Sequence, residues 1–128
     1  MLALTLEWVE KAEGDFLTAQ REFRARTAPN YDAVSFHSQQ CVEKYLKALL
    51  QESNLAFGKT HDLSVLLNLL LVIHPAWSRE LPAMRTLSAY AVELRYPGNT
   101  ADKAMAKSAL LLCKEFRSKA RLELGLEV

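Results

Sequence analysis

The chain has 128 residues, of which 50% are hydrophobic and 24% charged, the balance of a single soluble globular domain. Its formal net charge of +1 argues against tight nucleic-acid binding by counterion release alone, which needs a concentrated basic face. The most apolar stretch, residues 63–73, is far shorter than the ~20 residues of a membrane helix. Charged residues break the apolar run at the N-terminus, so we expect no secretory signal. We therefore expect one cytoplasmic domain spanning residues 1–128.

The hydrophobic periodicity predicts helices throughout the chain. The four glycines and four prolines fall mainly between the periodic segments, and no alternating strand pattern occurs. We predict five helices: Leu4–Arg24, Tyr31–Ser53, one capped by Thr60 and ending near His74, one from Pro82 that stops by Pro97, and one capped by Thr100. The second carries two apolar stripes and should be the central helix. The predicted fold is all-α, an up-and-down bundle of four main helices plus a shorter fifth.

The two cysteines indicate a reducing compartment. Cys41 and Cys113 each lie among apolar residues of a predicted helix and show no paired spacing. Such cysteines are typical of buried free thiols rather than of a zinc site or a disulfide framework. We expect no bound metal and no cofactor.

A polar cluster interrupts the apolar surface of the predicted central helix: Gln39, Gln40, Glu43, Lys44 and Lys47. Glu43 and Lys47 are four residues apart and should pair on the helix surface. One interpretation of the cluster is a solvated face. The other is a site for amide recognition or a contact across a dimer interface, because glutamine side chains both donate and accept hydrogen bonds.

Two further positions are candidates for binding an anion. His61 and Lys59 lie at a predicted helix start, where backbone N–H groups and the helix dipole favour negative charge. Arg95 lies in the last turn of the fourth predicted helix, from which its planar fork of donors can reach a phosphate. Local packing of His61 and simple capping by Arg95 are the alternatives. His37 and His74 are expected to be structural.

Three blocks of sequence together resemble the HEPN family, the higher eukaryotes and prokaryotes nucleotide-binding domain. They are Phe36-x-x-Gln39-Gln40-x-x-Glu43-Lys44-x-x-Lys47, then Lys59-Thr60-His61-Asp62-Leu63, then Arg95-Tyr96-Pro97. The resemblance covers nearly the whole chain and implies a helical bundle that is usually a homodimer. It also implies partnership with a minimal nucleotidyltransferase in a two-component system, frequently of toxin–antitoxin type.

Many members of that family are metal-independent endoribonucleases with an arginine followed, after four to six residues, by a histidine. In this chain Arg95 occupies the arginine position, but positions 100–102 are Thr100, Ala101 and Asp102. The resemblance is therefore to the branch with the Arg-Tyr-Pro block, which implies nucleotide binding and a nucleotidyltransferase partner. His61 would replace the missing histidine if it lies near Arg95 in space.

The leading hypothesis is a dimeric protein that binds a nucleotide or an RNA phosphate and acts with a nucleotidyltransferase. The predicted phosphate contacts are Lys59 and Arg95, with Gln40, Lys44 and Lys47 lining the groove. His61 would donate a hydrogen bond or act as an acid or base. One alternative is a metal-independent endoribonuclease that uses His61 and Arg95, and another is an interaction module that binds no ligand.

Overall fold

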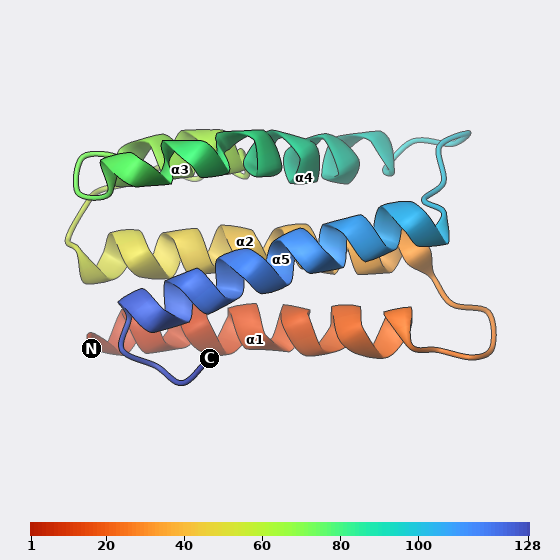
Figure 1. Ribbon diagram of the computed structural model, residues 1–128, viewed down its shortest axis with the longest axis horizontal. Helices are drawn as coiled ribbons and strands as arrows, with labels where there is room; N and C mark the ends of the chain where they lie inside the picture. Colours follow the sequence, from red (N-terminus) through yellow and green to blue (C-terminus); the bar gives the residue numbers. More distant parts are fainter.

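The computed structural model describes residues 1–128 as an all-helical bundle (Figure 1). Its elements are α1 (Ala3–Phe23), α2 (Tyr31–Glu52), α3 (Leu63–Leu70), the 3₁₀ helix η1 (Pro75–Glu80), α4 (Leu81–Glu93) and α5 (Lys103–Glu123). Four longer helices and the short α3 match the predicted architecture. None of these helices combines the length and the apolarity needed to cross a membrane.

Helix α2 is the centre of the bundle, as its two apolar stripes predict. It packs mainly against α1 and α5, while α3 and α4 form a second layer above it (Figure 1). Val42, Tyr45, Leu46 and Leu50 of this helix are fully buried. The burial of these apolar side chains is the main force that holds the layers together. Both chain ends lie at the same end of the bundle (Figure 1).

Two predicted helix caps are wrong by two residues. The N-cap of α3 is Asp62, whose carboxylate accepts from Ser64 N at 2.9 Å, and not Thr60. The N-cap of α5 is Asp102, which accepts from Met105 N at 2.8 Å, and not Thr100. In both cases the carboxylate two residues after the threonine caps the helix and places a negative charge at its positive dipole end. Helix α3 also ends at Leu70, earlier than the predicted His74.

The turn between α4 and α5 agrees with the sequence. Gly98 has a φ of 92°, a left-handed conformation that favours glycine, directly after Pro97, by which the fourth helix was predicted to stop. The turn reverses the chain so that α5 crosses in front of α2 (Figure 1).

Cys41 and Cys113 are both buried free thiols, as predicted. Burial raises the pKa of the Cys41 thiol well above its ordinary value, and its hydrogen bond with Cys113 raises it further. Cys41 is therefore a packing residue and a poor nucleophile.

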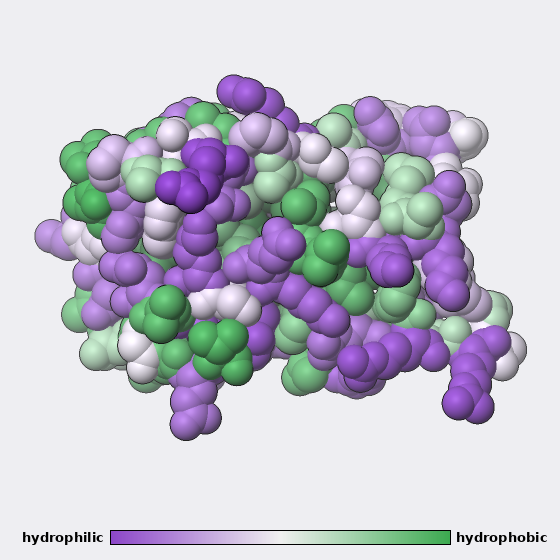
Figure 2. All heavy atoms as spheres, viewed as in Figure 1, coloured by the Kyte–Doolittle hydropathy of each residue, from purple (hydrophilic) through white to green (hydrophobic).

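Polar side chains cover most of the visible surface, and apolar ones gather in small groups between them (Figure 2). On α3, the exposed apolar residues Val65 and Leu69 are one helical turn apart, and the exposed Val72 follows the helix. Two of these side chains therefore share one outward face of α3.

Candidate functional site

Three of the five residues in the polar cluster of α2 are buried, and Gln40 and Lys44 are half-buried, which corrects the expectation of a surface pair and an open groove. The exposed fractions of Gln39, Glu43 and Lys47 are 2%, 3% and 6%. Lys47 lies over the ring of Trp8 from α1, 5.4 Å from its centre, in a cation–π contact. The cluster is covered within one chain by α1 and by the segment that leads into α3.

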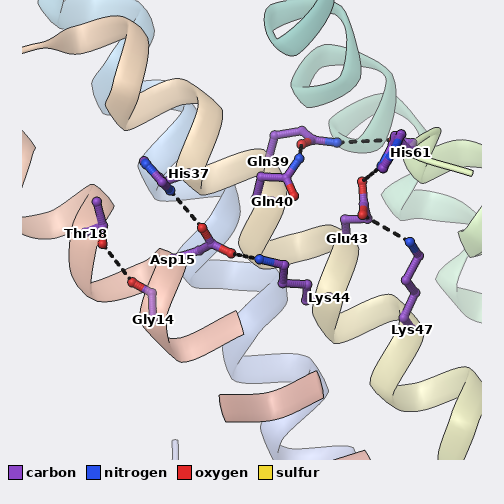
Figure 3. A network of polar contacts seen from close by, with 10 residues as sticks. All are labelled: Gly14, Asp15, Thr18, His37, Gln39, Gln40, Glu43, Lys44, Lys47 and His61. Carbon is purple, nitrogen blue, oxygen red and sulfur yellow. Dashed lines mark hydrogen bonds and ion pairs between the residues drawn. The ribbon is translucent and has the colours of Figure 1, made fainter. Parts of the chain in front are cut away.

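Glu43 is the hub of this cluster (Figure 3). Its Oε2 accepts from the Lys47 ammonium at 3.1 Å, and its Oε1 lies 3.1 Å from the Nδ1 of His61. An ionised carboxylate only accepts hydrogen bonds, so the Nδ1 of His61 carries the proton. The Nε2 of a neutral His61 is then an acceptor. Because the His61 side chain is 72% exposed while that of Glu43 is 4% exposed, a buried carboxylate orients an accessible imidazole.

The two glutamines fix the backbone beside that imidazole. Gln39 donates through its Nε2 to the carbonyl oxygen of His61 at 3.2 Å. Gln40 donates to the Oε1 of Gln39 at 3.0 Å, which completes a short chain of amides (Figure 3). The glutamines therefore hold the segment before α3 against α2, a role that the sequence did not indicate.

His61 and Arg95 line the same surface pocket, although 34 positions separate them in sequence. Gln39 from α2, Ser88 and Ala91 from α4, and Asp62 at the start of α3 also line it. The start of α3 is held against α4 by a hydrogen bond from Leu63 N to Ser88 Oγ at 3.3 Å. Arg95 is exposed, and no ion pair within the chain engages its guanidinium. The pocket thus combines a free cation with an oriented imidazole.

The expected anion site on the backbone of the α3 start is not available. Asp62 N donates to Thr60 Oγ1 at 3.1 Å, Leu63 N donates to Ser88, and Ser64 N donates to Asp62. These three N–H groups are engaged by the chain itself, and the Asp62 carboxylate adds negative charge beside them. An anion in this pocket would therefore depend on the side chains of Arg95 and His61.

None of the other predicted phosphate contacts lines the pocket of His61 and Arg95. Lys59 is exposed but does not line the pocket. The Lys44 ammonium is 2.5 Å from Asp15 Oδ2, and the Lys47 ammonium is paired with Glu43. Gln40 is bonded to Gln39. The single groove predicted to contain all of these residues is not formed, and only His61 and Arg95 come together.

Asp15 is a buried partner that the sequence interpretation missed. It is 9% exposed and binds both His37 Nδ1 at 2.7 Å and Lys44 (Figure 3). Its spacing from Ala12 and Ala19 puts it on the buried stripe of the helix, which was the available signal. His37 is partly buried and paired, as expected of a structural histidine.

A second, partly buried network joins α1, α2 and α5. Arg117 donates to both carboxylate oxygens of Glu13 at 2.8 and 2.6 Å, and Tyr45 Oη donates to Glu13 Oε2 at 2.6 Å. Burial raises the pKa of Glu13, but the hydrogen bonds from Arg117 and Tyr45 outweigh it and bring the pKa below its ordinary value. This network fixes the three helices and does not reach the pocket.

The fold and the pocket define an all-α bundle with a cationic surface site formed by two segments distant in sequence. The family model described as "HEPN domain" matches residues 5–123, nearly the whole chain. The chain belongs to the HEPN family. Family membership makes it a helical domain of a nucleotide- or RNA-related class. Neither the curated proteins nor the solved structures that were compared with the chain gave a match.

Proposed function

We propose that the chain binds a phosphate of a nucleotide or of RNA in the pocket between His61 and Arg95. The observation that carries the proposal is the unpaired Arg95 guanidinium beside an imidazole whose other nitrogen is held by Glu43. The guanidinium presents planar donors that match two phosphate oxygens, and protonated His61 donates from Nε2. We assign Lys59, an exposed cation of the segment before α3, an auxiliary contact with the ligand outside the pocket.

We further propose that the protein acts as a homodimer together with a minimal nucleotidyltransferase, in a two-component system of toxin–antitoxin type. Family membership supports this assignment. The exposed apolar residues Val65 and Leu69 of α3 and the following Val72 also support it, because exposed apolar surface is typical of protein interfaces. Co-purification of the chain with a nucleotidyltransferase encoded beside it, and its molar mass in solution, test the two parts separately.

Binding is tested by fluorescence anisotropy with labelled single-stranded RNA and by competition with mononucleotides, in EDTA. Arg95→Ala removes a charged hydrogen-bonding partner of the phosphate, so the affinity for RNA should fall by about tenfold or more. The matched control is Arg85→Ala, an exposed arginine within α4 that does not line the pocket, whereas Arg95 lies in the turn just after the end of α4 at Glu93. Equal affinities of wild type and Arg95→Ala would refute the site.

A second function, metal-independent cleavage of RNA, is favoured by the contact between Glu43 and His61. His61 Nε2 would remove the proton of a ribose 2′-hydroxyl while the 2′-oxygen attacks the adjacent phosphorus. The bond from phosphorus to the 5′-oxygen breaks, and that oxygen takes a proton from the imidazolium. The products are a 2′,3′-cyclic phosphate and a 5′-hydroxyl, and Arg95 stabilises the charge on the phosphate oxygens.

His61→Asn separates cleavage from binding. The asparagine amide can still donate to Glu43, but no Nε2 remains to accept a proton. Loss of cleavage in EDTA for His61→Asn supports the ribonuclease, provided that RNA binding, which keeps its Arg95 contact, weakens less than in Arg95→Ala. If wild type leaves RNA intact with and without the nucleotidyltransferase, the binding function remains and the catalytic one is rejected.

An interaction module without a ligand is the third possibility. Its expected sign was a Gln39–Glu43 cluster covered by a second copy, with no open pocket beside it. In this structure the cluster is covered within the chain, and a pocket lies next to Gln39. These observations favour the ligand-binding proposals over the module.

A further inference from the structure

A second hollow adjoins the proposed phosphate pocket. It lies between the first half of α2 and the end of α4, and Phe36, His37 and Tyr90 contribute to its lining. Ala91 and Arg95 line both hollows. The two hollows therefore adjoin each other at Ala91 and Arg95.

Three aromatic rings line this second hollow, those of Phe36, His37 and Tyr90. Phe36 is 38% exposed, although phenylalanine is usually buried, and the His37 ring meets it edge-on at 5.2 Å between centres. Tyr90 is partly buried on the facing helix. An exposed aromatic face beside a free arginine is suited to stacking against a planar ring.

Three polar side chains around the hollow each have one atom engaged within the chain. Asn30 Oδ1 accepts from Ala33 N at 3.0 Å, and Asp32 Oδ1 accepts from Ala101 N at 2.6 Å. The Nδ1 of His37 is held by Asp15. Asn30 Nδ2, Asp32 Oδ2 and His37 Nε2 have no partner within the chain, so hydrogen bonds to a base edge can add to stacking on the rings.

We propose that this hollow receives a nucleobase of single-stranded RNA whose phosphate lies on Arg95. The inference rests on the proposed phosphate site and names its substrate class, because bases within a duplex do not expose their faces for stacking. Phe36 supplies the stacking surface, and Arg95 links the base subsite to the phosphate subsite. Asp32 and Asp62 disfavour a second phosphate nearby, so each protomer neutralises one phosphate.

The experiment compares two fluorescein-labelled RNA octamers by anisotropy: one of adenosines, and one with the same sugar–phosphate backbone but no bases. Stacking of one base predicts that wild type prefers the adenosine octamer by about fivefold or more. Phe36→Leu keeps an apolar side chain but removes the ring, so it should lose that preference. Phe36→Tyr should retain it. Phe57→Leu is the matched control, because this aromatic residue lies in a separate hollow with Trp8.

Salt dependence separates the two subsites. One neutralised phosphate predicts a slope of log affinity against log salt of about −0.7 for a single strand. Arg95→Ala should weaken both octamers and flatten this slope, whereas Phe36→Leu should leave the slope unchanged.

The outcomes also separate this inference from the function on which it rests. Equal wild-type binding of both octamers, sensitive to Arg95→Ala, would reject the base subsite and keep the phosphate site. Binding of neither octamer would reject both. A Phe36→Leu variant that changes molar mass by light scattering but keeps the base preference would assign Phe36 to a protein interface and overturn the proposal.

Discussion

Glu43→Gln should be among the most destabilising single changes in the polar part of this protein. The Glu43 and Lys47 side chains are 4% and 8% exposed, so their ion pair at 3.1 Å is shielded from water. The substitution leaves the Lys47 ammonium buried without a counter-charge. Loss of one partner of a buried pair costs about 3–5 kcal/mol.

The structure favours the lower end of that range. The Trp8 ring still faces the ammonium in the variant, and the glutamine oxygen can still accept one hydrogen bond. We therefore expect a loss of about 3 kcal/mol, which a domain with a typical stability of about 5–15 kcal/mol survives. His61→Ala removes the other partner of Glu43, but that side chain is 72% exposed, so its loss should cost less than about 1 kcal/mol.

Urea unfolding followed by helical circular dichroism measures both variants. A double-mutant cycle with Lys47→Met sharpens the test: Glu43→Gln and Lys47→Met together should cost well below the sum of the two single changes. Glu80→Gln is the control, because its 2.5 Å pair with Lys119 is more exposed, at 20% and 32%.

A loss below about 1 kcal/mol for Glu43→Gln, or simple additivity in the cycle, would refute the reasoning. The pair would then behave as a solvated surface pair, and Glu43 would not be the fixed support of His61.

Three other predictions concern stability and use the same unfolding assay. The lowered pKa of Glu13 means that its contribution is present above the ordinary value of 4.5 and is lost as the pH falls through the lowered value. The stability difference between wild type and Glu13→Gln should therefore shrink between pH 5 and the acid limit of folding, and a constant difference would contradict this. Gly14→Ala should stabilise α1 by about 0.5–1 kcal/mol, since Gly14 is inside the helix and an added β-carbon meets no atom within 4 Å. A urea midpoint below that of wild type would contradict this prediction. Asp102→Ala should cost about 1 kcal/mol of stability and Thr100→Ala almost nothing, because Asp102 caps α5. A larger loss for Thr100→Ala than for Asp102→Ala would show that Thr100 is the cap.

The helices were predictable because their signals are local. Apolar periodicity identified α1 to α5 but not the 3₁₀ helix η1; Pro82 lies in the first turn of α4, and Pro97 follows the end of that helix. The caps of α3 and α5 were missed because a threonine and an aspartate two residues apart can each cap a helix. Sequence spacing alone does not decide which of them meets a free N–H group.

The candidate site was less predictable because it depends on contacts between distant segments. The spacing of Glu43 and Lys47 predicted their pairing, but their burial depends on Trp8 of α1 and on the path of the segment before α3. The shared pocket of His61 and Arg95 arises from the packing of α3 on α4. Neither arrangement leaves a periodic signal in the chain.

The most direct test of the central claim is a titration of the ¹⁵N-labelled protein with a short single-stranded RNA, followed by NMR of backbone and arginine side-chain resonances. The account predicts that the largest changes occur at Arg95, His61 and their neighbours Ser88 and Ala91. Changes confined to another surface, such as the hollow beside Trp8, would contradict the assignment of the site.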